Sequence, residues 1–167
     1  MNGDVSATDA TRVRSAVWHG EVFGVAQIEG EIMIHRLVDD VFDFVADERN
    51  EPRYNPKMTS VERLSDGEIG LGTQFRAEVV SGGKPLSMVI EFISFERPHR
   101  LGSRTTMPGM MILGDLTFEA VGDATRMHWA WDIQPTGAMR LLKPLITIMG
   151  RRQEREIWTS LKRCLEA

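Results

Sequence analysis

The 167-residue chain contains the three residue types of a hydrolytic triad, at Ser103, His128 and Asp132. In such a triad the histidine accepts the serine proton and the carboxylate orients the histidine, so the three side chains must contact one another in series. His128 and Asp132 are four positions apart in a segment that alternates like a strand, which separates them by ~13 Å. The same alternation turns both side chains toward solvent. We therefore do not expect hydrolase chemistry of this kind.

The spacing of other residues gives little support to a metal or dinucleotide site. The histidines show no i, i+4 pairing and have no neighbouring cysteine ligand; they are His19, His35, His99 and His128. The stretch GEIGLG has its glycines at Gly67, Gly70 and Gly72. It joins two expected strands, whereas a dinucleotide loop joins a strand to a helix. The sequence thus predicts no metal and no cofactor.

Proton transfer would require a donor and an acceptor that face the same substrate. Tyr54, Ser103 and Gln153, helped by Thr105, could hydrogen-bond a carbonyl group, and the first three are the candidate catalytic residues. None of them is a good general base near neutral pH. The strand alternation described below places no Asp, Glu or His on the inner face, which favours binding over catalysis.

The composition indicates one domain without an excess of positive charge. The net charge is -4 and the pI about 5.6, so nucleic acid is not an expected partner. A single cysteine, Cys164, excludes an internal disulfide and fits the cytoplasm. The polar first residues lack a signal-peptide core, and no run approaches the ~18 apolar residues of a membrane span. We expect a disordered tail over residues 1–20 and one domain over residues 21–167.

The elements that must position these side chains begin with one strand and two short helices. Apolar and polar residues alternate over 24–36, which predicts a strand with one wet face. Apolar residues then recur at helical spacing over 38–47, with two acids in the first turn that complement the helix dipole. Two prolines limit a second short helix to 51–55, which would hold Tyr54 in a defined place.

A succession of alternating segments separated by turn signals follows. We expect strands at 58–64, 73–81, 86–95, 101–107, 110–120 and 125–134. Their short connections imply antiparallel neighbours and hence a meander. Residues 136–165 then form a long amphipathic helix, in which Pro144 either introduces a kink or marks the true start. Only this helix is long enough to cover the apolar face of the sheet.

The charged residues of each strand are expected to face outward, which assigns the remaining side chains to the inner face. This inner set is Phe75, Ala77, Val79, Met88, Ile90, Phe92, Leu101, Ser103, Thr105, Met107, Ile112, Gly114, Leu116, Phe118, Met127, Trp129, Trp131 and Ile133. Such a wall is aromatic, aliphatic and rich in methionine, which adapts to irregular shapes. Small residues at Gly30, Ala77, Gly114 and Gly150 would leave space for a ligand beside the backbone, although a plain core has the same alternation.

The order of elements and several turn motifs together resemble a known superfamily. The motifs are HRLVDDVFDFVAD, RYNP, GEIGLGT, FERPHRL, FEAVGDATRMHW and the terminal LKRCLE. From about residue 24 onward the chain is similar to the START-like, helix-grip superfamily (SRPBCC) of polyketide cyclases/dehydrases and lipid-transport proteins. Relatives often carry tryptophan between the arginine and asparagine of RYNP, where this chain has Tyr54.

The resemblance implies an α+β helix-grip fold, with a curved seven-stranded antiparallel sheet around a long C-terminal helix. Two short helices would roof a cavity between sheet and helix. The leading hypothesis is binding or transport of a lipid, isoprenoid or polyketide-like molecule in that cavity. The expected ligand-binding residues are Tyr54 at the entrance, Phe75, Met88, Ile90, Phe118, Trp129, Trp131, Met149 and Gln153.

Two alternatives remain open. One is a polyketide cyclase or dehydratase, in which Tyr54, Ser103 and Gln153 would orient carbonyl groups. The other is an interaction module. Residues 141–149 are apolar almost all round, which would suit a homodimer or contact with a membrane surface.

Overall fold

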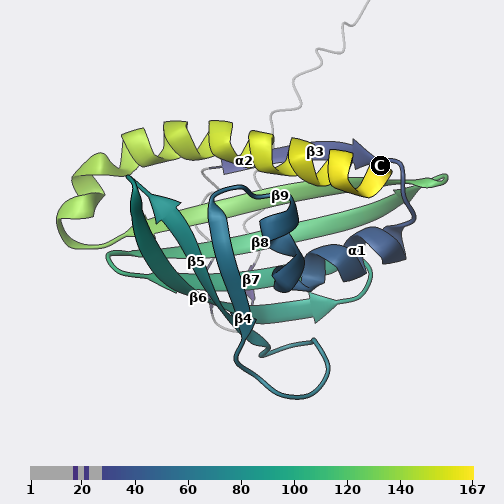
Figure 1. Ribbon diagram of the computed structural model, residues 1–167, viewed down its shortest axis with the longest axis horizontal. Helices are drawn as coiled ribbons and strands as arrows, with labels where there is room; N and C mark the ends of the chain where they lie inside the picture. The colour runs from purple at the N-terminus through teal and green to yellow at the C-terminus, as the bar shows by residue number, and fades with distance from the viewer. Residues whose placement is uncertain (1–16, 19–20, 23–27) are drawn as a thin grey trace, which may run out of the picture.

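A curved antiparallel sheet and one long helix form the body of the protein (Figure 1). The computed structural model describes residues 17–18, 21–22 and 28–167. The sheet has seven strands in the order β3-β9-β8-β7-β6-β5-β4. This is the helix-grip arrangement expected from the sequence, with the long helix against the concave face.

The strands follow the predicted alternation closely. The bounds are β3 Ile28–Ile34, β4 Met58–Arg63, β5 Gln74–Ser81, β6 Lys84–Glu96, β7 Arg100–Met107, β8 Met110–Val121 and β9 Ala124–Pro135. Two further short strands, β1 Val17–Trp18 and β2 Glu21–Val22, pair with each other. The disordered tail expected over residues 1–20 falls largely outside the described residues.

The meander β4 to β9 leaves one edge of β4 and one edge of β9 free, and β3 pairs with the free edge of β9. Residue Ile28 of β3 faces Trp131 of β9, and Ile34 faces Thr125. Consequently β3 and β4, which are neighbours in sequence, lie at opposite edges of the sheet. The two helices between them must therefore cross the open end of the curved sheet.

Helix α1 (Val38–Ala46) and the 3-10 helix η1 (Glu48–Arg53) make this crossing. The apolar stripe of α1 is buried, with Val41 and Phe42 fully so. Asp43 on its outer side pairs with Arg97 at 2.6 Å. The Asp47 carboxylate accepts the backbone N–H of Arg49 and so caps η1. Because η1 begins three residues earlier than expected, it carries Glu48 as well as Glu51.

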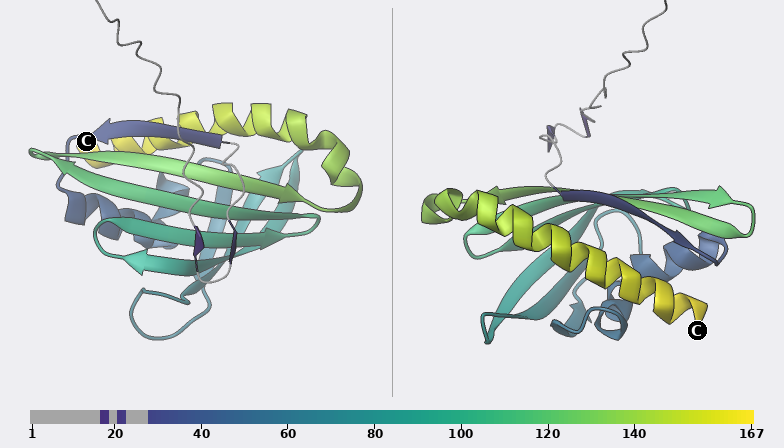
Figure 2. Two further views of the ribbon diagram at one scale, coloured as in Figure 1. Left: turned by 180° about the vertical axis from the view of Figure 1, so that it is seen from behind. Right: turned by 90° about the horizontal axis from the view of Figure 1, so that it is seen from above.

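The C-terminal segment divides into the 3-10 helix η2 (Gly137–Leu142) and helix α2 (Lys143–Glu166). Pro144 lies in the first turn of α2, where its missing N–H costs nothing, so it marks the true start of the helix. Figure 2 shows α2 crossing the sheet. Its buried residues are Ile157, Trp158 and Leu161, all in the second half. Of the helices in the described residues, none is both long and apolar enough to span a bilayer.

Two glycines of the sheet serve the core rather than a ligand. A Cβ on Gly114 would stand 2.1 Å from Cζ3 of Trp131, and a Cβ on Gly30 would stand 2.3 Å from Cζ2 of Trp129. Gly150 of α2 similarly leaves room for Cδ1 of Ile28. The expectation that these glycines leave space for a ligand is therefore wrong, since indole rings and an isoleucine side chain already fill it.

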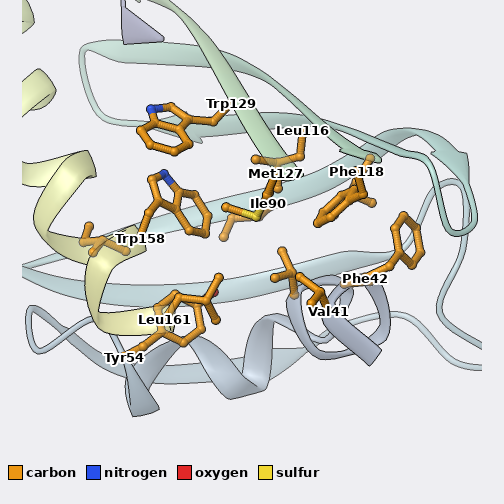
Figure 3. Close-up of a cluster of buried hydrophobic side chains, with 14 of the residues drawn as sticks. Val41, Phe42, Tyr54, Ile90, Leu116, Phe118, Met127, Trp129, Trp158 and Leu161 are labelled. Atoms are coloured by element: carbon orange, nitrogen blue, oxygen red, sulfur yellow. The ribbon is translucent and has the colours of Figure 1, made fainter. Parts of the chain in front are cut away.

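The core lies between the sheet, α1 and the second half of α2 (Figure 3). Trp158 of α2 lies between Trp129 of the sheet and Tyr54, with ring centroids 5.9 and 6.2 Å away. Phe42 of α1 makes edge contacts with Phe118 at 5.2 Å. These contacts close one end of the space beneath the curved sheet and leave the other end open.

Candidate functional site

A cavity of about 480 Å³ occupies the other end, between the concave face, η1 and α2. Its sheet wall comes from β4 to β9 and includes the strand residues Met58, Val79, Leu86, Met88, Ile90, Leu101, Ser103, Thr105, Met107, Met110, Ile112, Leu116 and Trp131. Val45 of α1 also lines it. Five methionines take part, at positions 58, 88, 107, 110 and 149. Flexible thioether side chains of this kind adapt to ligands of irregular shape.

The structure divides the expected ligand-binding residues into two groups. Six line the cavity, namely Tyr54, Met88, Ile90, Trp131, Met149 and Gln153, as does the further catalytic candidate Ser103. The other three, Phe75, Phe118 and Trp129, lie in the packed core and are at most 5% exposed. Strand alternation identifies the inner face correctly, but only the helices decide which part of that face is covered.

Tyr54 takes a deeper position than expected. It is 3% exposed and packs between Phe44 and Trp158, so it lies in the wall of the cavity and not at the entrance. Its hydroxyl forms no hydrogen bond with a described residue. Burial raises the pKa of the phenol well above its usual range, and the charges of nearby glutamates add to the rise. The group is therefore a proton donor at any physiological pH.

The mouth of the cavity lies where α2 begins. Met149 lines the cavity yet is 65% exposed. One turn further, Gln153 accepts a hydrogen bond of 2.8 Å from the ammonium group of Lys57. This contact joins α2 to the segment between η1 and β4 across the opening. Gln153 is thus positioned at the rim, where it can orient whatever enters.

Three carboxyl groups line the cavity, and all three come from helices, which the strand alternation did not cover. Glu48 and Glu51 come from η1, and Glu154 comes from α2. We call these three residues the carboxyl cluster. Each is half-buried because it faces the cavity while protein surrounds its remaining sides. Asn55 donates a hydrogen bond of 2.7 Å to Glu51 and holds that side chain in place.

The two acids of η1 form a coupled pair. Burial raises the pKa of Glu48 well above its usual range, and the charge of Glu51 and a hydrogen bond between the two carboxyl groups raise it further. Burial also raises the pKa of Glu51, although hydrogen bonds from Glu48 and Asn55 oppose the rise. The pair therefore retains a proton, with Glu48 as its donor and Glu51 as the acceptor.

Glu154 faces this pair from α2. Burial raises its pKa to about 7; the indole N–H groups of Trp131 and Trp158 oppose the rise, and the charge of Glu51 supports it. Neither indole N–H reaches full hydrogen-bonding geometry with a described acceptor. A carboxyl group with this pKa exists in both protonation states near neutrality, which suits it to proton exchange.

A signal for Glu154 was present in the sequence. It precedes Ile157 by three positions and Trp158 by four, so it shares the buried stripe of α2. Strand alternation could not reveal this residue, because the strand acids of the cavity region all face outward and the inward acid lies on a helix. Glu48 and Glu51 could not be assigned from helical spacing either, because their direction depends on how η1 crosses the end of the sheet.

The triad residues are not assembled. Ser103 faces the cavity, whereas Asp132 lies on the opposite face of the sheet, opposite Leu113 in the strand register. Asp132 is nevertheless 6% exposed and accepts a hydrogen bond from Gln134, so the expectation that it faces solvent is wrong. Within residues 28–167 and the two short N-terminal strands, no three His, Cys, Asp or Glu side chains are arranged to hold a metal ion.

Solved structures with this fold include proteins of several kinds. A START superfamily protein from Mycobacterium smegmatis has a TM-score of 0.70 at 13% identity, covering 83% of this chain and 96% of its own. Zhui aromatase/cyclase from Streptomyces sp. R1128 has a TM-score of 0.68 at 16% identity, covering 83% and 92%. TTHA0849 from Thermus thermophilus has a TM-score of 0.69 at 18% identity, covering 81% and 94%. These identities show a shared fold and no more.

Comparison with curated proteins finds no significant match. The family model described as "Polyketide cyclase / dehydrase and lipid transport" matches residues 25–166, which include the whole seven-stranded sheet, α1 and α2. Since the match spans most of the chain and agrees with the fold, this protein belongs to the polyketide cyclase/dehydrase and lipid transport family.

Proposed function

We propose that the protein binds and carries a hydrophobic small molecule in the cavity. This molecule is a lipid, an isoprenoid or a polyketide-like compound. The observation that supports this is the cavity itself. Its volume of about 480 Å³ lies within the ~300–1,000 Å³ typical of small-molecule sites. Its methionine and tryptophan wall offers apolar contact, and the carboxyl cluster offers a few polar groups at one side.

The binding free energy available from apolar contact favours a ligand larger than a fragment. Burial of ~300 Å² of apolar surface yields about 7 kcal/mol before costs, and association takes at least about 4 kcal/mol of it. The remainder corresponds to millimolar binding. A ligand with useful affinity must therefore extend along the wall or make polar contacts as well.

Native mass spectrometry of the purified protein, followed by solvent extraction, tests the proposal directly. A defined apolar adduct is the expected result.

The site is then checked by tryptophan fluorescence during titration with 1-octanol. Trp131→Phe should remove much of the ligand-induced change because Trp131 lines the cavity, whereas Trp129→Phe, two positions along the same strand, should retain it. Loss of the signal in Trp129→Phe alone would place the ligand elsewhere.

A cyclase or dehydratase is the second candidate, and the carboxyl cluster is the observation that favours it. Glu154, with a pKa of about 7, would exchange protons with a carbonyl substrate, while the protonated Tyr54 donates a hydrogen bond to it. Ser103 and Gln153 face the same space. In an assay with a polyketide-like substrate, Tyr54→Phe should lower the rate at least tenfold without unfolding the protein. A binding protein would show no turnover to lose.

The interaction module remains a hypothesis of its own. Its support is the exposed apolar surface where α2 begins, formed by Leu141, Leu142, Leu145, Ile148 and Met149. Sedimentation over a range of concentrations tests a homodimer, and flotation with vesicles tests membrane contact. The single cysteine keeps the cytoplasm as the expected location.

A further inference from the structure

The carboxyl cluster lacks a positive partner. None of Glu48, Glu51 and Glu154 forms an ion pair with a described lysine or arginine, although such pairs are common elsewhere on the protein. Lys57 is the cationic residue that lines the cavity, and its ammonium group is hydrogen-bonded to Gln153 at the exposed rim. Grouped carboxyl groups beside an apolar cavity are costly unless something compensates their charge.

Buried polar groups beside the cluster also lack full partners. The indole N–H of Trp158, a residue only 6% exposed, completes no hydrogen bond with a described acceptor, and neither does that of Trp131. Tyr54 is also only 3% exposed, and its hydroxyl forms no hydrogen bond with a described residue. All three are donors, and all three residues line the same cavity as the carboxyl groups. Ionised carboxylates would accept from such donors, but ionisation requires a positive charge that the described residues do not supply there.

The aromatic rings around the cluster favour a cation as well. The ring centroids of Tyr54 and Trp158 are 6.2 Å apart, and those of Trp131 and Trp158 are 6.4 Å apart. Tryptophan and tyrosine faces attract an ammonium group, most strongly where water is excluded. Carboxylates and aromatic faces together form the usual surroundings of a bound amine, whereas they would repel a carboxylate or phosphate.

We propose that the ligand of this cavity is a hydrophobic amine, whose ammonium group binds at the carboxyl cluster while its apolar body lies along the methionine and tryptophan wall. The inference rests on the proposed function, namely that the cavity binds a hydrophobic small molecule. It adds the chemical class of the polar end.

Binding of the cation is coupled to proton release. The groups around the cluster are Tyr54 at the end of η1, Lys57 at the rim, Cys164 on α2 and Asp47 beside η1. The cations Arg49 and Arg63 of β4 act on Asp47. Burial keeps the pKa of Glu154 at about 7 in the empty protein, so a bound ammonium ion must displace a proton at lower pH. Affinity for the amine should therefore fall about tenfold per pH unit below neutrality and level off above it.

Calorimetric titration with octylamine, 1-octanol and octanoate tests the inference, because the three probes share one chain and differ in charge. At about pH 8 we expect octylamine to bind at least tenfold more tightly than 1-octanol, and octanoate to bind most weakly. At about pH 6 the measured enthalpy should depend on the buffer, which reports the released proton.

Matched variants locate the effect. Glu154→Gln should lower the affinity for octylamine until it no longer exceeds the affinity for 1-octanol by tenfold. Glu156→Gln, two positions along α2 on the exposed side and paired with Arg152, should change neither. Near-ultraviolet circular dichroism checks folding, and Glu51→Gln serves as a second variant if Glu154→Gln unfolds.

The outcomes separate the two proposals. If 1-octanol binds as tightly as octylamine, or if Glu154→Gln and Glu51→Gln keep the amine preference, the amine inference is wrong while the proposed function stands. If the purified protein retains no apolar adduct and none of the probes binds even at millimolar concentration, the proposed function fails as well.

Discussion

At the scale of single residues, the protein places acids where strand alternation gives no indication of them. Glu154 lies on the buried stripe of α2, and its pKa of about 7 results from burial among aromatic rings. Surface acids of the same helix behave differently. Glu166, for example, has its pKa lowered to about 2 by hydrogen bonds from His35 and Lys162. The environment of each carboxyl group, and not its type, decides its chemistry.

The raised pKa of Glu154 predicts a stability that falls as pH rises. The folded protein retains a proton that the unfolded chain releases at its ordinary pKa of 4.5, so the free energy of unfolding decreases between about pH 4.5 and 7. Glu154→Gln cannot ionise, and it should be more stable than the wild type by about 1–3 kcal/mol at pH 8.

Urea unfolding of both proteins at about pH 5 and pH 8 measures this difference. The other carboxyl groups titrate in both proteins, so their contributions cancel in the difference between the two free energies of unfolding. Glu156→Gln provides the control and should follow the wild type. An equal stability of wild type and Glu154→Gln at both pH values would contradict the prediction.

The contact between Gly114 and Trp131 predicts a second effect at residue scale. Gly114→Ala introduces a Cβ at 2.1 Å from the indole, and it should destabilise the protein by about 1–3 kcal/mol through overpacking. Gly70→Ala has no atom within 4 Å of the new Cβ and should stay within about 0.5 kcal/mol of the wild type. Chemical denaturation compares the two. Equal stabilities would show that Trp131 moves aside freely.

At the scale of elements, α2 has two halves with different roles. The second half packs Ile157, Trp158 and Leu161 against the sheet, and its end is held by a hydrogen bond from Arg36 to the carbonyl of Leu165. The first half contributes Met149 and Gln153 to the mouth of the cavity, while Leu145 and Ile148 stay exposed. One helix therefore anchors the fold and borders the ligand site.

Two identical substitutions on α2 test this division. Leu161 is fully buried, and Leu161→Ala should cost about 2–5 kcal/mol. Leu145 is 55% exposed, and Leu145→Ala should change stability by no more than about 0.5 kcal/mol. Denaturant unfolding measures both. Similar losses in the two variants would mean that the first half of α2 is also packed in solution.

At the scale of the whole molecule, the cavity exists because the helices cover only part of a strongly curved sheet. Helix α1 and the second half of α2 fill one end with aromatic side chains, and η1 closes the wall of the other end. No single element encloses the space. The cavity is therefore sensitive to the bulk of side chains on its wall.

Filling the cavity should separate binding from stability. Ile112 is half-buried in the wall, and Ile112→Trp would place an indole in open space. We expect the affinity for 1-octanol to fall at least tenfold while the free energy of unfolding stays equal or rises, since the change occupies a void. Calorimetry and urea unfolding measure the two quantities. Unchanged affinity would place the ligand outside this cavity.

Much of the fold was accessible from the sequence, because alternation and turn residues are local properties. The six strands of the meander and α1 lie within two residues of their expected bounds, whereas the long helix begins at Lys143, seven residues later than expected. The site was less accessible. Phe75, Phe118 and Trp129 share the periodicity of the cavity wall and yet belong to the core. Periodicity reports the face on which a side chain lies, but not what covers that face.

The order and type of the main elements, the apolar concave face and the family could all be inferred from the amino-acid sequence. Tertiary structure alone decided that β3 pairs with β9, that Tyr54 is buried in the wall, and that Glu48 and Glu51 meet Glu154 across the cavity. The reason is physical: hydrophobic alternation acts between near neighbours in the chain, whereas the meeting of η1 and α2 joins residues about a hundred positions apart. Such contacts depend on the curvature and packing of the complete sheet.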